Sequence, residues 1–138
     1  MSHLVTAYIA LGSNLGDRAG YLAFAREKLA EYEGVTIMAA SDVDETLPLG
    51  GLEQPAYLNQ MVVVRTGLEA PQLLSACHDV ERLAGRRRST KWCSRTLDLD
   101  LVMYGNVMCD LPNLVLPHPG LRDRPFWASE IARMEAYG

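Results

Sequence analysis

The order of hydrophobic patterns along the chain is the feature that most narrows the folds open to it. Four segments alternate apolar and polar side chains or are rich in β-branched residues, as strands are: residues 5–11, 35–43, 57–66 and 96–104. Two segments between them carry apolar residues in a helical stripe and end at a glycine: residues 17–33 and 70–84. This β-α-β-β-α-β order predicts an α+β, ferredoxin-like split βαβ fold, with a mostly antiparallel sheet and both helices on one face.

The rest of the chain is expected to add smaller elements to this core. Residues 46–55 contain two prolines and two glycines, which predicts a loop long enough to suggest function. Short strands are expected near residues 107–109 and 114–116, and a short helix at the end. The buried stripe of the first helix is predicted to hold Leu15, Leu22, Ala25 and Leu29.

Length and composition favour a single globular domain over residues 1–138. A chain of this size buries about two-thirds of its unfolded surface, so it needs no disulfide or metal to fold. Apolar residues make up 49% and charged residues 22%, which excludes a disordered chain.

The sequence also predicts a cytoplasmic protein with no membrane contact. No stretch approaches the roughly 18 uninterrupted apolar residues of a membrane span. No Lys or Arg precedes Arg18, so a secretory signal is not expected. Cys77, Cys93 and Cys109 are an odd set without a CxxC pair, which favours a reducing compartment, and their spacing to the histidines fits no conventional zinc site.

Positive charge gathers in one segment of an otherwise acidic chain. Residues 81–100 contain six cations and three anions, so this segment carries +3 while the remainder carries −7, for a net charge of −4. The overall charge argues against a general nucleic-acid binder. The cluster itself fits either a compact anionic ligand or a solvated basic loop.

Two aspartates alternate with leucines at the end of this segment. On a strand, Leu97, Leu99, Leu101 and Met103 would share one face, while Asp98 and Asp100 would share the other. Their repulsion at a Cβ separation of about 7 Å is roughly 2 kcal/mol at an effective dielectric constant near 20. A divalent cation such as Mg²⁺ would remove that cost. The alternative is an amphipathic strand with a polar outer face.

Nearby residues favour a phosphate ligand held by metal and arginine. No GxxxxGK[ST] segment or kinase glycine loop is present, so neither type of phosphate cradle is expected. Trp92 and Phe126 could sandwich a flat heterocycle, although single aromatic residues more often pack in a core. Asn59 could bind a ring edge or be a satisfied strand amide. His118, between two prolines, could contact a ligand or pin its own loop.

Taken together, these features resemble the 6-hydroxymethyl-7,8-dihydropterin pyrophosphokinase family of the folate pathway. The matching strings occur in family order across almost the whole chain: YIALGSNLGDR (8–18), LPLG (47–50), QPAYLNQ (54–60), ERLAGR (81–86), RTLDLDLVMYG (95–105) and LPHPGLRDRPF (116–126). Each string alone is weak, whereas the set is highly specific.

The resemblance implies transfer of a diphosphate from ATP to the hydroxymethyl oxygen of the pterin, with release of AMP. It implies two Mg²⁺ ions held by Asp98 and Asp100, and it assigns catalytic roles to Arg86, Arg88, Arg95, Asp98 and Asp100. ATP would contact Leu74, Glu81, Arg86, Trp92, Arg95, Leu101, His118 and Arg124. The pterin would contact Gly12, Thr46, Leu47, Pro48, Leu49, Tyr57, Asn59, Trp92 and Phe126.

The chain departs from the family pattern in three respects. Cys93-Ser94 stands where Gly-Pro is usual. The basic loop is about one residue short and has Lys91 where Arg is usual, and the C-terminal segment is shorter by about one helical turn. A pterin- or nucleotide-binding paralogue with weakened catalysis is therefore one alternative. A nucleic-acid-binding ferredoxin-like module and a DxD-type sugar transferase are the others. The resemblance favours a monomer that acts on small molecules and binds no nucleic acid.

Overall fold

A central antiparallel sheet organises the computed structural model, which describes residues 4–46, 56–85 and 97–135. Its strands are β1 (Val5–Ser13), β2 (Val35–Ala40), β3 (Asp44–Thr46), β4 (Tyr57–Thr66) and β5 (Asp98–Tyr104). They lie in the order β2-β4-β1-β5, with β3 also paired to β4, and every one of these pairs is antiparallel. A separate hairpin joins β6 (Cys109–Leu111) to β7 (Leu114–Leu116). The predicted α+β, ferredoxin-like arrangement is confirmed.

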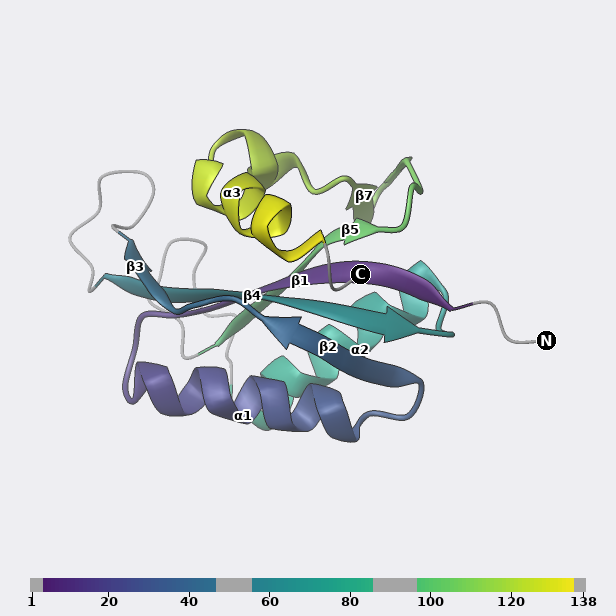
Figure 1. Ribbon diagram of the computed structural model, residues 1–138. Coiled ribbons are helices and arrows are strands. Elements are labelled where there is room, and N and C mark those ends of the chain that lie inside the picture. The colour runs from purple at the N-terminus through teal and green to yellow at the C-terminus, as the bar shows by residue number, and fades with distance from the viewer. Residues whose placement is uncertain (1–3, 47–55, 86–96, 136–138) are drawn as a thin grey trace.

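Helices cover both faces of this sheet. The two predicted helices, α1 (Arg18–Glu31) and α2 (Ala70–Leu83), lie on one face, as expected (Figure 1). The 3₁₀ turn η1 (Pro119–Arg122) leads into α3 (Pro125–Met134), which lies on the other face. None of the helices in the described ranges is long and apolar enough to cross a membrane.

Local signals explain where the first two helices begin and end. The Asp17 side chain accepts a hydrogen bond from the Gly20 N–H at 3.1 Å and caps α1. Glu69 and Gln72 form a capping box at the start of α2, where the Gln72 side chain accepts from the Glu69 N–H at 2.8 Å. After α1 the chain turns at Gly34, whose φ of 90° suits a residue without a side chain.

Two apolar layers result, one on each side of the sheet. The larger layer packs α1 against the sheet through the predicted stripe residues Leu22 and Leu29, and α2 through Leu73. The smaller layer packs Trp127 and Ile131 of α3 against the opposite face. Strands β1 and β4 are therefore buried on both faces, which explains their nearly continuous apolar sequences.

A bulge in β5 turns Met103 to the face opposite the one predicted. Leu97, Leu99 and Leu101 pack in the layer of α1 and α2, as expected. Met103 was predicted to join them but packs on the α3 side. The reason is a register shift: Leu101 pairs with Ile9 and Met103 with Tyr8, so the residue between them has no partner on β1 and the alternation reverses.

Several element boundaries also differ from the sequence-based expectation. Leu15 was expected in the stripe of α1, but it precedes the helix and is 45% exposed. The second strand ends at Ala40 instead of residue 43, and Thr46 closes β3 instead of opening a loop. Local periodicity does not reveal the short β3, because its three residues are held by pairing with β4.

The two leucines at opposite ends of α2 test this packing. Leu73 is fully buried, so Leu73→Ala should leave a cavity and lower the free energy of unfolding by about 3 kcal/mol. Leu83 is 66% exposed, so Leu83→Ala should change it by less than about 0.5 kcal/mol. Denaturant unfolding measures both variants, and equal losses would contradict the described orientation of α2.

Candidate active site

A row of three directly paired residues forms the floor of the candidate site. Gly12 on β1 lies opposite Asn59 of β4 on one side and opposite Asp98 of β5 on the other. Directly opposed residues point to the same face of a sheet, so Asn59 and Asp98 flank a position that has no side chain. Their Cα atoms are separated by two strand spacings, about 10 Å. We call the position over Gly12, which has no side chain between Asn59 and Asp98, the slot.

The next row places the second aspartate on the same face. Ala10 of β1 pairs with Asp100 of β5 and with Met61 of β4. Ala10 and Met61 belong to the apolar layer under α3, so both aspartates project on the α3 side of the sheet. The predicted shared face of Asp98 and Asp100 is therefore confirmed.

The paired carboxylates have a donor chemistry that suits Mg²⁺. Asp98 and Asp100 are both partly exposed, and the Asp100 side chain keeps 40% of its surface. Within the described ranges no three His, Cys, Asp or Glu side chains gather closely enough to hold a metal ion. Mg²⁺ commonly takes only one or two carboxylates from a protein and completes its shell with water and phosphate oxygens. The two aspartates match that requirement.

His118 is held at the edge of β5 by its backbone and its ring. Its N–H donates to the Val102 carbonyl at 2.9 Å, and its Nδ1 accepts from the Gly120 N–H at 2.9 Å. Because Nδ1 accepts, the ring proton lies on Nε2, which is 3.5 Å from Asp100 Oδ1. His118 therefore contacts Asp100 and fixes its own loop, and a contact of this ring with a ligand stays a prediction.

Trp127 of α3 contacts three of the predicted site residues on the α3 side of the sheet, although it was not itself predicted from the sequence. The His118 ring meets it edge-on at a centroid distance of 5.3 Å, and the Arg124 guanidinium lies 4.8 Å over its ring. Phe126 packs edge-on at 6.4 Å. Trp127, Ile131 and Met134 follow helical spacing, so the signal that marks this face was present in the sequence.

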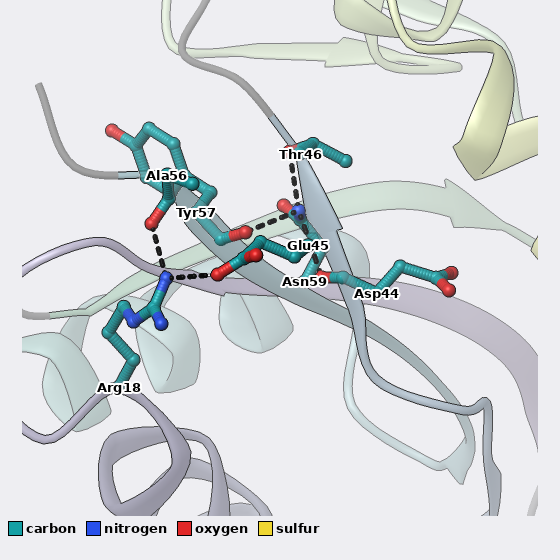
Figure 2. Close-up of polar contacts among 7 residues, drawn as sticks. All are labelled: Arg18, Asp44, Glu45, Thr46, Ala56, Tyr57 and Asn59. Atoms are coloured by element: carbon teal, nitrogen blue, oxygen red, sulfur yellow. Dashed lines mark hydrogen bonds and ion pairs between the residues drawn. The ribbon is translucent and has the colours of Figure 1, made fainter. Parts of the chain in front are cut away.

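Asn59 presents one end of its amide to the slot. Its Nδ2 donates to Thr46 Oγ1 at 2.6 Å, with the carbonyl of Tyr57 at 3.4 Å and that of Asp44 at 3.5 Å (Figure 2). Its Oδ1 lies 3.6 Å from the point that a Cβ on Gly12 would occupy. The β3 side thus fixes the donor end, and the acceptor end lies beside the slot.

Arg18 anchors this corner of the site, a role that the sequence analysis did not anticipate. Its Nη1 donates to Glu45 Oε2 at 2.8 Å and to the Ala56 carbonyl at 2.7 Å (Figure 2). These contacts tie the first residue of α1 to β3 and to the start of β4. Thr46, whose hydroxyl accepts from Asn59 Nδ2, directly follows Glu45 in the strand that Arg18 contacts.

Three residues that the resemblance assigned to ATP lie on the α1 and α2 side of the sheet, whereas Asp98 and Asp100 project on the α3 side. Leu74 and Leu101 pack in the larger apolar layer. Glu81 is 5% exposed, and its Oε2 accepts from the Leu99 N–H at 2.8 Å. Among the described strands β5 pairs only with β1, so Glu81 satisfies a backbone group on its outer edge.

Glu81 also affects the pKa of the buried Cys77 thiol. Burial, and next the charge of Glu81, raise the pKa of the Cys77 thiol well above its ordinary value. The thiol therefore stays protonated and packs as an apolar group in α2.

The structure brings many of the predicted site residues to one face and does not describe the others. The α3 side of the sheet and the segment above it hold Gly12, Thr46, Tyr57, Asn59, Asp98, Asp100, His118, Arg124 and Phe126. Outside the described residues lie Leu47, Pro48, Leu49, Arg86, Arg88, Trp92 and Arg95. Their roles stay predictions.

Comparisons with known proteins point to one family. The family model described as 7,8-dihydro-6-hydroxymethylpterin-pyrophosphokinase matches residues 8–136. Three curated relatives carry the name 2-amino-4-hydroxy-6-hydroxymethyldihydropteridine pyrophosphokinase. The Bacillus subtilis protein is 37% identical over 93% of this chain and 77% of its own length. The Methylorubrum extorquens protein is 38% identical over 95% and 83%, and the Haemophilus influenzae protein 35% identical over 89% and 77%.

The bond from Leu99 to Glu81 yields a prediction about the strand that carries the aspartates. Glu81→Ala would leave the Leu99 N–H without its carboxylate acceptor and should lower the free energy of unfolding by about 2 kcal/mol. Glu27→Ala removes an exposed carboxylate from α1 and should have almost no effect. Urea unfolding measures both variants, and a fully stable Glu81→Ala protein would show that this bond does not support β5.

Proposed function

Because the chain belongs to the 7,8-dihydro-6-hydroxymethylpterin-pyrophosphokinase family, we propose that it transfers a diphosphate from ATP to the hydroxymethyl oxygen of 6-hydroxymethyl-7,8-dihydropterin and releases AMP. The protein is an enzyme, a pyrophosphokinase of folate biosynthesis. The observation that carries the detailed proposal is the row Asn59–Gly12–Asp98, which brings an amide and a carboxylate to one face of the sheet and supports a ring-binding position between them.

The pterin side of the proposal depends on the slot over Gly12. The ring carries N–H donors on one edge, and Asn59 Oδ1 lies beside the slot as an acceptor while Thr46 holds Nδ2. Phe126, at the start of α3, and Trp92 would stack on the ring faces. Tyr57, Leu47, Pro48 and Leu49 would complete the wall around its edge.

The phosphate side depends on Asp98 and Asp100. Two Mg²⁺ ions, when bound there, would supply charge neutralisation and a template for the triphosphate. His118 Nε2, 3.5 Å from Asp100 Oδ1, restricts the orientation of that carboxylate. The aspartates at the edge strand would thus hold the nucleotide tail beside the hydroxymethyl group of a ring seated over Gly12.

Arginines would supply the remaining positive charge. The hydroxymethyl oxygen must attack the β-phosphorus in line with the departing AMP oxygen, and positioning and charge stabilisation account for most of the catalysis. We assign Arg86, Arg88 and Arg95 as donors to the transferring group, where negative charge develops. Trp92, His118 and Arg124 would contact ATP on the side of the aspartates, with Arg124 held against Trp127. Leu74, Glu81 and Leu101 would contact the nucleotide from the α2 side of β5.

The proposal also covers the domain organisation, oligomeric state, location and partners of the enzyme. We expect one catalytic domain over residues 1–138, a monomer in the cytoplasm, with small-molecule substrates and no nucleic-acid partner. Calorimetric titration with a non-hydrolysable ATP analogue, with and without Mg²⁺ and then with the pterin, tests the substrate assignment. Pterin binding that strengthens after nucleotide and metal, together with pterin-dependent AMP release, supports it. Absence of pterin-dependent AMP release would overturn it.

The aspartate pair gives the sharpest kinetic prediction. Asp98→Ala and Asp100→Ala should each lower kcat at least about a thousandfold, because the charge of the transferring group would lose its counterion site. Asp110 is an exposed carboxylate on β6, so Asp110→Ala should retain wild-type kcat. A coupled assay for AMP measures all three, and near-normal turnover in either site variant would contradict the metal assignment.

Gly12 gives a prediction that separates binding from folding. A Cβ at this position would lie 3.6 Å from Asn59 Oδ1 and 3.6 Å from Tyr57 Cδ1, both ordinary contacts, so Gly12→Ala should fold normally. The new methyl group would fill the slot and should raise KM for the pterin about tenfold, with little change in KM for ATP.

A second glycine provides the control for this measurement. Gly67 lies in the turn after β4, away from the slot, and a Cβ there would meet only Leu4 Cδ2 at 3.9 Å among the described atoms. Gly67→Ala should leave both KM values unchanged. Equal pterin KM values for Gly12→Ala and the wild type would place the ring elsewhere.

A further inference from the structure

Glu130 is a carboxyl group buried on the inner side of α3. It is 1% exposed, at a position that the proposed chemistry does not use. Ser41, between β2 and β3, donates its hydroxyl to Glu130 Oε2 at 3.1 Å. The other oxygen, Oε1, is buried and accepts a hydrogen bond from no donor among the described residues. An ionised carboxylate in this setting would be costly to bury, because half of it lacks a donor.

The group that faces Glu130 from the sheet is itself an acid. The Asp44 carboxylate of β3 lies close enough to the Glu130 carboxyl to raise its pKa. Figure 2 shows the Asp44 side chain pointing away from Asn59, on the opposite side of β3 from Arg18. Two carboxyl groups can share a hydrogen bond only when one of them carries a proton. Because Glu130 is the more buried of the two, it is the group that holds the proton.

We propose that Glu130 is a positioning residue for the pterin half of the site: as a neutral carboxylic acid it donates a hydrogen bond to Asp44 and so fastens α3 to β3. The expected effect on kinetics rests on the proposed function, whereas the contact between Glu130 and Asp44 does not depend on it. Glu130 would hold α3 and β3 together and would not touch the substrate.

The contact joins the two elements that carry the pterin residues. One turn before Glu130, α3 carries Phe126 and Trp127. Two residues after Asp44, β3 carries Thr46, whose hydroxyl accepts from Asn59 Nδ2. If α3 and β3 separate, Phe126 on α3 is no longer held at a fixed distance from Asn59, which Thr46 of β3 orients. Loss of the contact should therefore weaken pterin binding more than ATP binding.

The groups around Glu130 determine how the strength of its contact with Asp44 changes with pH. Burial is the largest cause that raises the pKa of Glu130, to about 7, and Asp44 raises it further by hydrogen bonding and charge. Ser41, and Arg133 of its own helix, lower that pKa by smaller amounts. The folded-state pKa thus lies above the ordinary value of 4.5. The stabilisation is complete below about pH 4.5 and is lost as pH rises through about 7, where an ionised Glu130 repels Asp44.

The test is the pH profile of the full-length enzyme compared with that of Glu130→Gln. In the wild type, KM for the pterin should rise about fivefold from about pH 6 to about pH 8, with a smaller change in KM for ATP. The amide of Glu130→Gln can donate to Asp44 at every pH, so this variant should show a flatter pterin KM. Asp44→Asn removes the repelling charge and should also flatten the profile.

A matched control and a second measurement keep the result independent of catalysis. Glu135→Gln removes an exposed carboxylate at the end of α3 and should keep the wild-type profile. The Tm of the wild type should fall relative to that of Glu130→Gln over the same pH range, whether or not the pterin is the substrate. A wild-type pH dependence retained in Glu130→Gln, in both KM and Tm, would overturn the proposal. A flattened Tm profile without pterin turnover would support the contact and refute the proposed function.

Discussion

The pairing of β1 with strands on both sides is the constraint on which the site depends. Gly12 is opposite Asn59 and Asp98 only in the observed register, and a slip of one residue would turn the side chains of one neighbour to the wrong face. The buried sequence of β1 makes such a slip costly, because apolar residues such as Ile9 and Leu11 would leave their layer. The same burial that stabilises the sheet therefore sets the spacing between the amide and the carboxylates.

The position of β5 at the edge of the sheet explains how the aspartates are both held and accessible. An edge strand leaves backbone groups unpaired on one side, and two residues from other elements satisfy them here. Glu81 accepts from the Leu99 N–H, and the His118 N–H donates to the Val102 carbonyl. These bonds fix the strand without a further β-strand partner in the described part of the chain, so the Asp100 carboxylate stays 40% exposed beside His118.

Sequence periodicity was enough to predict the element order and the shared face of Asp98 and Asp100, because both follow from local alternation. It was not enough for Met103, since the bulge that redirects this residue arises from pairing with β1. The roles of Trp127 and Glu130 were missed for a related reason. Their helical spacing is visible in the sequence, but which face of the sheet α3 covers is decided by contacts between distant segments. Register and layer order are tertiary properties that no short window contains.

The second face of the sheet shows how a short C-terminal segment can complete such a site. One helix of ten residues covers the apolar surface, through Trp127, Ile131 and Met134, and carries Phe126 in its first turn. A helix this short has few apolar contacts to fix its orientation, so a single polar contact has a large influence on it. A buried acid opposite Asp44 lowers the stability available at high pH, but its directional hydrogen bond selects one position of α3 among several that hydrophobic packing alone would allow.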